Sequence, residues 1–169
     1  MSNVFYALIL AGGSGERFWP LSRKATPKQL LRLFSSQTLV EETVRRLDGF
    51  VPKENILVLT NQEQEAAIRE LLPDLPEDNI LAEPAKRDTA AAIALGVGII
   101  AARNPSATMV VLPADHRISD QTAFQTDLRS AASIAQKSGD LITIGITPTW
   151  GCPGFGYIER GKQIENSNA

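Results

Sequence analysis

The chain has 169 residues, 43% hydrophobic and 21% charged, a composition typical of one globular domain that can bury a sizeable core. Seventeen basic against nineteen acidic residues leave a net charge of −2, which gives no electrostatic reason to expect nucleic acid or an anionic membrane as a partner. Its single cysteine, Cys152, excludes an internal disulfide, and the first apolar run, 4–11, lacks a basic flank and is too short for a signal peptide or membrane span, so we expect a cytoplasmic protein.

Short β-branched runs alternate with helical patterns along the whole chain. In chain order, the runs predict strands over 4–10, 56–60, 80–82, 108–112 and 141–146. The helical patterns predict a helix starting near Thr38 and further helices over 61–72, 89–103 and 121–138. Such alternation is typical of a three-layer αβα, Rossmann-like domain with a mainly parallel sheet. We expect this domain to span 1–164 and the polar residues 165–169 to form a tail.

Several helix ends carry their own signals. Asn61 has the character of an N-cap with Gln64 three residues on, and Pro73 stops that helix. Asp120 is expected to cap the helix that ends before Gly139. The pattern over 89–103 is apolar almost all round, which predicts a buried helix.

The loop after the first strand is the most informative stretch. The run Leu10-Ala11-Gly12-Gly13-Ser14-Gly15-Glu16-Arg17 is followed at loop distance by Pro27-Lys28-Gln29. Glycines let backbone N–H groups close around an oxygen-rich ligand, and an arginine with a lysine suits a polyphosphate. The chain has no Gly-Lys-Ser/Thr triplet of a P-loop, and Phe18 stands where a dinucleotide fingerprint needs glycine. These residues predict a nucleoside triphosphate site.

Asp115 follows the apolar strand 108–112, at the sheet edge where ligands bind in such folds. Mg²⁺ combines carboxylate, water and phosphate oxygens, so one protein carboxylate can be its main anchor. The alternative is that Asp115 only caps a turn toward His116 or Arg117. His116, the single histidine, could orient Asp115, touch a ligand or be structural.

Two further segments are candidates for ligand contact. Glu83 follows the third strand and could meet a nucleoside, or be a solvated loop charge. Asp88 and Thr89 open the next helix, whose first N–H groups are free, although Asp88 could be a plain N-cap. The turn-rich segment 147–159 is expected to enter a strand that carries Phe155 and Tyr157.

Four ordered motifs carry a family resemblance over some nine-tenths of the chain. The run from Leu10 to Leu30 resembles the signature of the sugar-1-phosphate nucleotidyltransferases, and its 17–23 part resembles their mannose-1-phosphate guanylyltransferase branch. The supporting motifs are Arg17-Phe18-Trp19-Pro20-Leu21-Ser22-Arg23, Glu83-Pro84-Ala85-Lys86-Arg87-Asp88-Thr89-Ala90-Ala91-Ala92-Ile93, Leu112-Pro113-Ala114-Asp115-His116 and Gly156-Tyr157-Ile158-Glu159. The chain departs from the branch at three positions. It has Asp88 where relatives usually have Asn, Ala91 where they usually have Pro, and Phe155 where they usually have Tyr.

The resemblance implies transfer of a guanylyl group from GTP to mannose 1-phosphate, with Mg²⁺ and in-line attack. It implies catalytic roles for Arg17, Lys28 and Asp115, with the metal on Asp115. Nucleotide contacts are expected at Leu10, Ala11, Gly12, Gly13, Ser14, Gly15, Arg17, Lys28, Glu83, Asp88 and Thr89, and sugar contacts at Gly156, Tyr157 and Glu159.

Family members normally continue well past this point with a further sugar-binding segment and a second acidic metal ligand. Two alternatives therefore stay open. One is another nucleotidyltransferase of this fold, such as a cytidylyltransferase for methylerythritol phosphate, and the other is a non-catalytic nucleotide-binding fragment. Nothing in the sequence indicates an oligomeric state.

Overall fold

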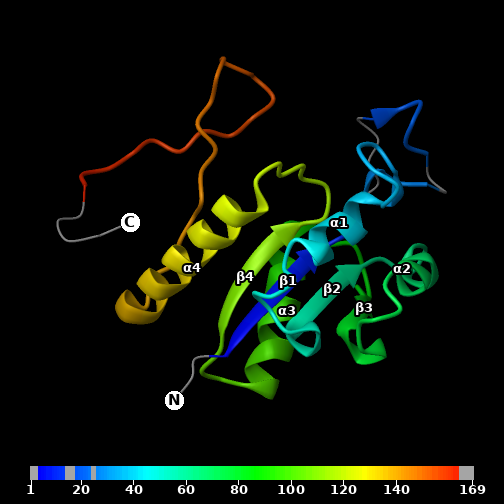
Figure 1. The fold of residues 1–169 in the computed structure, drawn as a ribbon, viewed down its shortest axis with the longest axis horizontal. Helices are drawn as coiled ribbons and strands as arrows, with labels where there is room; N and C mark the ends of the chain where they lie inside the picture. Colours follow the sequence, from blue (N-terminus) through cyan, green and yellow to red (C-terminus); the bar gives the residue numbers. More distant parts are fainter. Residues whose placement is uncertain (1–3, 14–17, 24–25, 164–169) are drawn as a thin grey trace.

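A computed structural model describes residues 4–13, 18–23 and 26–163. Its sheet has four parallel strands in the order β3-β2-β1-β4 (Figure 1). The strands are β1 (Phe5–Leu10), β2 (Ile56–Thr60), β3 (Ile80–Ala82) and β4 (Thr108–Pro113). Leu10 at the end of β1 aligns with Pro113 at the end of β4, so the two strands finish level with each other.

The helices are α1 (Leu39–Arg45), α2 (Glu65–Leu71), α3 (Asp88–Arg103) and α4 (Gln121–Ser138), with 3₁₀ turns at Lys28–Leu30, Lys53–Asn55 and Glu77–Asn79. Helices α1, α2 and α4 cover one face of the sheet and α3 covers the other. The predicted three-layer αβα class with a parallel sheet is therefore confirmed. Within the described part of the chain, no helix is long and apolar enough to cross a membrane.

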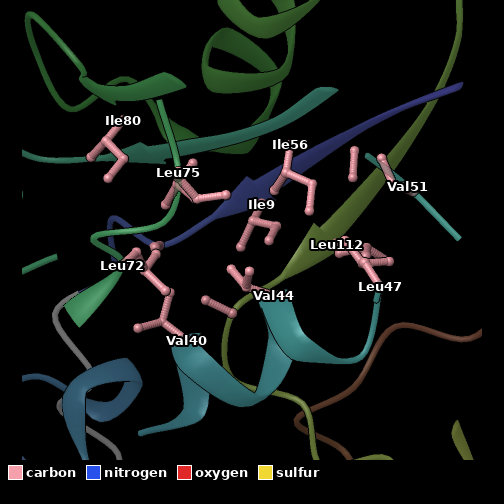
Figure 2. Packing of buried hydrophobic residues seen from close by; sticks show 14 of the residues in the cluster. Ile9, Val40, Val44, Leu47, Val51, Ile56, Leu72, Leu75, Ile80 and Leu112 are labelled. Atoms are coloured by element: carbon pink, nitrogen blue, oxygen red, sulfur yellow. The ribbon is translucent and has the colours of Figure 1, made fainter. Parts of the chain in front are cut away.

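The two faces of the strands form two cores because successive side chains point to opposite sides. Ile9 and Ile56 face α1, where they pack among Val40, Val44 and their neighbours (Figure 2). On the other face Leu8 and its neighbours on β2 pack against α3. Burying each such side chain contributes about 1.5–3 kcal/mol, which fixes the strand ends that carry the loops.

Side chains cap the starts of two helices. Thr38 and Glu41 form a reciprocal capping box ahead of α1. The Asp120 side chain accepts a hydrogen bond from the Ala123 N–H, and Gly139 ends α4 with φ of 75°. Both predicted ends of this last helix are thus confirmed.

The predicted start of α2 is wrong by three residues. Asn61 does not cap the helix, which begins only at Glu65 after Gln64. Instead the Asn61 side chain accepts the Gln64 N–H at 3.0 Å and closes a turn before the helix. The reason is tertiary, since both side chains also bond to the glycine loop described below.

Helix α3 is less buried than its composition predicts. Only Ala92, Gly96 and Ile100 are buried, while Val97 is exposed on the opposite side. A four-stranded sheet covers one face of the helix, and within the described residues nothing covers the other. The apolar composition of α3 predicted a helix buried on all sides, but composition does not show whether anything packs on the face away from the sheet.

The predicted strand over 141–146 is wrong in this structure, and 147–159 does not enter a strand either. Residues 139–163 contain no helix or strand, and Leu141 and Ile146 are exposed. The segment leaves α4 and runs apart from the sheet (orange to red in Figure 1). A β-branched run becomes a strand only when a neighbouring strand accepts its hydrogen bonds, and local sequence does not reveal that neighbour.

Gly96 gives a direct test of the contact between α3 and β1. A methyl group at Gly96 would lie 2.3 Å from Leu8 Cδ2, and Leu8 is fully buried. Gly96→Ala is expected to lower the free energy of unfolding by about 1–3 kcal/mol through overpacking, measured by urea denaturation.

Gly98 in the same helix is the matched control, because a methyl group there meets no atom within 4 Å among the described residues. Gly98→Ala should raise the free energy of unfolding by about 0.5–1 kcal/mol through helix propensity. Equal effects of the two substitutions would show that α3 does not pack this closely on β1.

Candidate functional site

The strand order creates a crevice at the carboxyl ends of β1 and β4. The chain goes from β1 outward to β2 and β3 and then returns to place β4 on the other side of β1. Ligands of open parallel sheets bind at such a reversal of strand order. The glycine loop follows β1, Glu83 follows β3 and Asp115 follows β4, so the predicted convergence of these three segments on one sheet edge is confirmed.

Amide and hydroxyl side chains donate hydrogen bonds to the backbone carbonyls of the described part of the glycine loop. Gln29 Nε2 donates to the carbonyl of Ala11 at 2.8 Å and to that of Gly13 at 2.9 Å. Thr60 Oγ1 donates to Ala11 O at 3.1 Å. Asn61 Nδ2 donates to the Gly12 carbonyl at 3.1 Å. Each carbonyl from Ala11 to Gly13 therefore has a protein partner.

The amides also support one another. Gln29 bonds to Gln64 Oε1, and Gln64 Nε2 reaches the Gly13 carbonyl at 3.4 Å. Both glutamines are buried, with 3% and 5% of their surface exposed. Buried amides rigidify a backbone when their partners are satisfied. No bond between described residues uses the N–H of Gly12 or Gly13, so these two donors remain for a ligand.

This support was missed at the level of sequence. Gln29 stands in the Pro27-Lys28-Gln29 motif, but it was given no role, and Asn61 and Gln64 were assigned to a helix cap. The one local signal was Asn61, an uncharged polar residue directly after the buried strand β2. The acceptors of Gln29, Asn61 and Gln64 lie 16 to 51 residues away, which no local pattern reveals.

Lys28 and Asp115, predicted separately, lie together at the crevice. Lys28 Nζ is 3.0 Å from Asp115 Oδ2, with side-chain exposures of 20% and 40%. The ammonium also sits 4.4 Å from the centre of the Phe18 ring. The pair spans from the loop after β1 to the loop after β4, so cation and carboxylate face the same space. Arg17, Ser14 and Gly15 lie outside the described residues.

A cavity of about 730 Å³ opens beside Gly12. Its lining comes from three segments, the glycine loop with Trp19, Ser22 and Arg23, the turn at 61–64, and 83–86. Drug-sized ligands occupy cavities of about 300–1,000 Å³. The volume therefore admits a nucleoside next to the described part of the glycine loop.

Glu83 lies against the glycine loop inside this cavity. Its N–H donates to the Thr60 carbonyl at 2.7 Å, and a methyl group at Gly12 would lie 2.8 Å from Glu83 Oε1. Burial raises the pKa of the Glu83 carboxyl above its ordinary value, and nearby Lys86 partly opposes this. Glu83 is thus a partly desolvated acceptor within the cavity wall.

Asp88 and Thr89 are exposed at the start of α3, and the cavity lining stops at Lys86. Asp88 is not an N-cap, because the position before α3 is Arg87 and no side chain caps the helix there. Asp88 instead adopts φ of 61°, a conformation that Asp and Asn tolerate better than most residues.

Gly156, Tyr157 and Glu159 are not brought to the crevice. They lie on the exposed segment after α4, and none of them lines the cavity beside Gly12. The Tyr157 hydroxyl accepts the Cys152 N–H at 2.6 Å and donates to the Cys152 carbonyl at 3.1 Å. Its contacts are therefore within its own loop.

The donor set at the crevice fits one kind of metal. Among the described residues no group of three or more acidic, histidine or cysteine side chains is close enough to enclose an ion. Asp115 therefore stands as one partly exposed carboxylate. That suits a hard cation which keeps water and takes phosphate oxygens from a substrate, and it does not suit a structural zinc.

Comparison with known proteins agrees with this geometry. Mannose-1-phosphate guanylyltransferases of Sinorhizobium fredii and Escherichia coli strain K12 are each 42% identical to the chain, over 92% and 95% of its length. A crystal structure titled mannose-1-phosphate geranyltransferase, from Thermus thermophilus, superposes with a TM-score of 0.71 at 41% identity, covering 79% of this chain and 38% of that one.

The chain spans about a third of the length of these curated relatives, 31% and 34%. The profile of the family described as nucleotidyl transferase matches residues 6–167, nearly the whole sequence. Together with the parallel sheet and the loops at its carboxyl edge, this match shows that the chain belongs to the nucleotidyl transferase family.

Proposed function

We propose that this chain binds GTP at the carboxyl edge of the sheet and transfers its guanylyl group to mannose 1-phosphate, giving GDP-mannose and pyrophosphate. The observation that carries the proposal is the cavity of about 730 Å³ lined by Gly12 and Glu83, at the same edge of the sheet as the Lys28–Asp115 pair. The names of the relatives support the choice of substrates. We further propose a single nucleotidyltransferase domain over 1–164 with a polar tail over 165–169, acting in the cytoplasm.

The base would lie in the cavity. Guanine presents two adjacent donors, N1–H and N2–H₂, and the Glu83 carboxylate is an acceptor on the cavity wall that can take both. Adenine has no N1–H donor, so it would leave this partly desolvated carboxylate unpaired, at a cost of about 1–3 kcal/mol. Asp88 and Thr89 remain candidates for contact with the nucleotide from outside the cavity lining.

The triphosphate would extend from the cavity along the glycine loop, from Leu10 to Gly15. The N–H groups of Gly12 and Gly13 would meet its oxygens, Arg17 would hold the β- and γ-phosphates, and Lys28 would neutralise the α-phosphate and the attacking phosphate. A phosphate oxygen of mannose 1-phosphate attacks the α-phosphorus, that P–O bond forms, and the bond to pyrophosphate breaks. No covalent enzyme intermediate is needed, because positioning and charge neutralisation supply the rate.

Asp115 is the residue that would hold Mg²⁺. The bound ion would supply neutralisation of the charge that develops on the departing pyrophosphate. The Asp115 carboxylate is paired with Lys28 in the structure. Moving Lys28 onto phosphate frees this carboxylate, so binding of the triphosphate prepares Asp115 for its second role. Gly156, Tyr157 and Glu159 would contact the sugar only after their segment comes to the crevice.

The pKa of Glu83 predicts a pH dependence of GTP binding. Because this pKa is raised by burial, the carboxyl becomes protonated at a higher pH than an exposed glutamate does. GTP affinity should fall roughly tenfold as the pH drops through this raised pKa, since a protonated carboxyl is a poorer acceptor for two donors. Calorimetric titration of GTP across the acidic range measures it.

Glu83→Gln should bind GTP weakly at neutral pH and show no step in the acidic range, while Glu54→Gln on the surface should behave as the parent. If the GTP affinity of Glu83→Gln fell by the same factor over the acidic range, Glu83 would not be the group that recognises the base.

The same pKa shift also makes the free energy of unfolding decrease as the pH rises from the ordinary glutamate pKa to the raised one, because the folded state binds the proton more tightly.

A further inference from the structure

A second hollow, which shares no lining residue with the nucleotide cavity, lies where the end of α1 meets the loop before α4. Its volume is about 360 Å³. Three arginines line it, Arg45 and Arg46 from the end of α1 and Arg117 from the loop after β4. We call these three residues the arginine cluster. In a chain with net charge −2, such a gathering of cations is local rather than part of a basic surface.

Arg46 is the buried member of the cluster. Only 6% of its surface is exposed, and burial lowers the pKa of its guanidinium, an effect that Glu42 partly offsets. Its side chain donates one hydrogen bond, to the His116 carbonyl at 3.0 Å, and lies 5.7 Å from the Phe124 ring. A buried cation is costly unless it is paired with an anion.

No member of the cluster forms an ion pair with another described residue. Arg45 donates to Gln37 Oε1 at 3.0 Å, and the Arg117 guanidinium stacks 4.5 Å from the Phe34 ring. A guanidinium carries five N–H donors, so each arginine retains free donors after these contacts.

One carboxylate also lines the hollow. Glu42 accepts the Ser35 hydroxyl at 2.5 Å and interacts with the Arg46 guanidinium through its charge. Three cations against one anion leave about two positive charges in the cavity. These positive charges balance the roughly two negative charges that a phosphate group carries near neutral pH, and guanidinium groups bind phosphate oxygens in pairs of hydrogen bonds.

We propose that the arginine cluster binds the phosphate group of a small phosphorylated molecule, at a site separate from the nucleotide cavity. The volume of about 360 Å³ lies near the lower end of small-molecule cavities, so the ligand is the size of pyrophosphate or a monosaccharide phosphate. Arg46 holds the carbonyl of His116 and Arg117 lies two residues after Asp115. A ligand on the cluster therefore touches the loop that carries Asp115.

The test is calorimetric titration of inorganic phosphate, pyrophosphate and mannose 1-phosphate, each without Mg²⁺, into the chain carrying Lys28→Ala, which weakens anion binding at the glycine loop. Adding Arg45→Gln and Arg117→Gln should weaken binding of the tightest of the three by about tenfold or more, because two charged hydrogen-bond partners are lost. These two positions are chosen because both side chains are exposed, so the fold does not depend on them.

Arg129→Gln is the matched control, since Arg129 also stacks on a phenylalanine, 4.9 Å from the Phe50 ring, but lies outside the hollow. It should leave the affinity unchanged. The ring resonance of His116, the one histidine of the chain, should move with phosphate in the control and stay in the double variant.

If pyrophosphate or inorganic phosphate binds most tightly of the three, the ligand is a free anion. If mannose 1-phosphate binds most tightly, the ligand is an organic phosphate. Either supports the site. No binding in the Lys28→Ala background, or equal affinity with and without the two arginine substitutions, would overturn it. The GTP response of the parent chain is measured separately, so this proposal and the proposed function fail independently.

Discussion

Lys28→Ala is expected to reduce the kcat of pyrophosphate release from GTP and mannose 1-phosphate by roughly 10²–10³-fold, the usual cost of losing one preorganised charge contact in the transition state. Lys28 lies 3.0 Å from Asp115 at the carboxyl edge of the sheet, where both would face the reacting phosphates. Because the pair is partly exposed, its loss should cost the fold at most about 1 kcal/mol. Activity and thermal midpoint should therefore respond very differently.

Lys53 provides the control for this experiment. It forms an equally short ion pair, 2.8 Å to Asp74, but it stands in the 3₁₀ turn before β2, at the opposite end of the strands. Lys53→Ala should leave pyrophosphate release unchanged. A Lys28→Ala protein with a kcat within about threefold of the parent would contradict the placement of Lys28 on phosphate.

Gln29→Glu is expected to have the second large effect, on the fold and on the nucleotide together. The substitution keeps the shape of the side chain but replaces the Nε2 donor, which serves the carbonyls of Ala11 and Gly13, by an acceptor. The buried Ala11 carbonyl and the part-buried Gly13 carbonyl then each lose one of two donors, and a carboxylate is buried against them, so the free energy of unfolding should fall by about 2–4 kcal/mol. GTP affinity should also fall, because the glycine loop loses its support.

Gln136→Glu is the matched control, since Gln136 is an exposed amide on α4 that donates to Thr108. Its free energy of unfolding should change by less than about 0.5 kcal/mol. Gln29 could stabilise the fold only, or it could also position the glycine loop for the nucleotide. The two roles are separated by measuring GTP binding and turnover of Gln29→Asn and Gln29→Glu at temperatures where both variants are folded. If both bind GTP as the parent does, the amide support does not shape the nucleotide site.

The fold was predictable to a large extent because its strands and helices carry local signals. The strands over 56–60 and 80–82, the helix start near Thr38 and the cap at Asp120 lie where the sequence places them. Alternation of strands and helices also predicted the parallel sheet, and with it the convergence of the glycine loop, Glu83 and Asp115. These features depend on short stretches of chain and on a general rule of topology.

What the sequence did not reveal depends on contacts between distant residues. Gln29, Asn61 and Gln64 support the glycine loop through bonds to carbonyls far along the chain. The pairing of Lys28 with Asp115 spans 87 positions. The run over 141–146 has the composition of a strand, but no adjacent strand receives it, and composition cannot supply one.

The central claim is that the cavity beside Gly12 and Glu83 is a guanine nucleotide site. It is tested most directly by the thermal midpoint of the 169-residue chain with GTP and Mg²⁺, compared with ATP, CTP and UTP, for the parent and for Lys28→Ala and Glu83→Gln. We predict a rise that is largest with GTP and reduced in both variants, in line with stabilisation of the folded state by a bound ligand. A midpoint that no triphosphate changes would contradict the account.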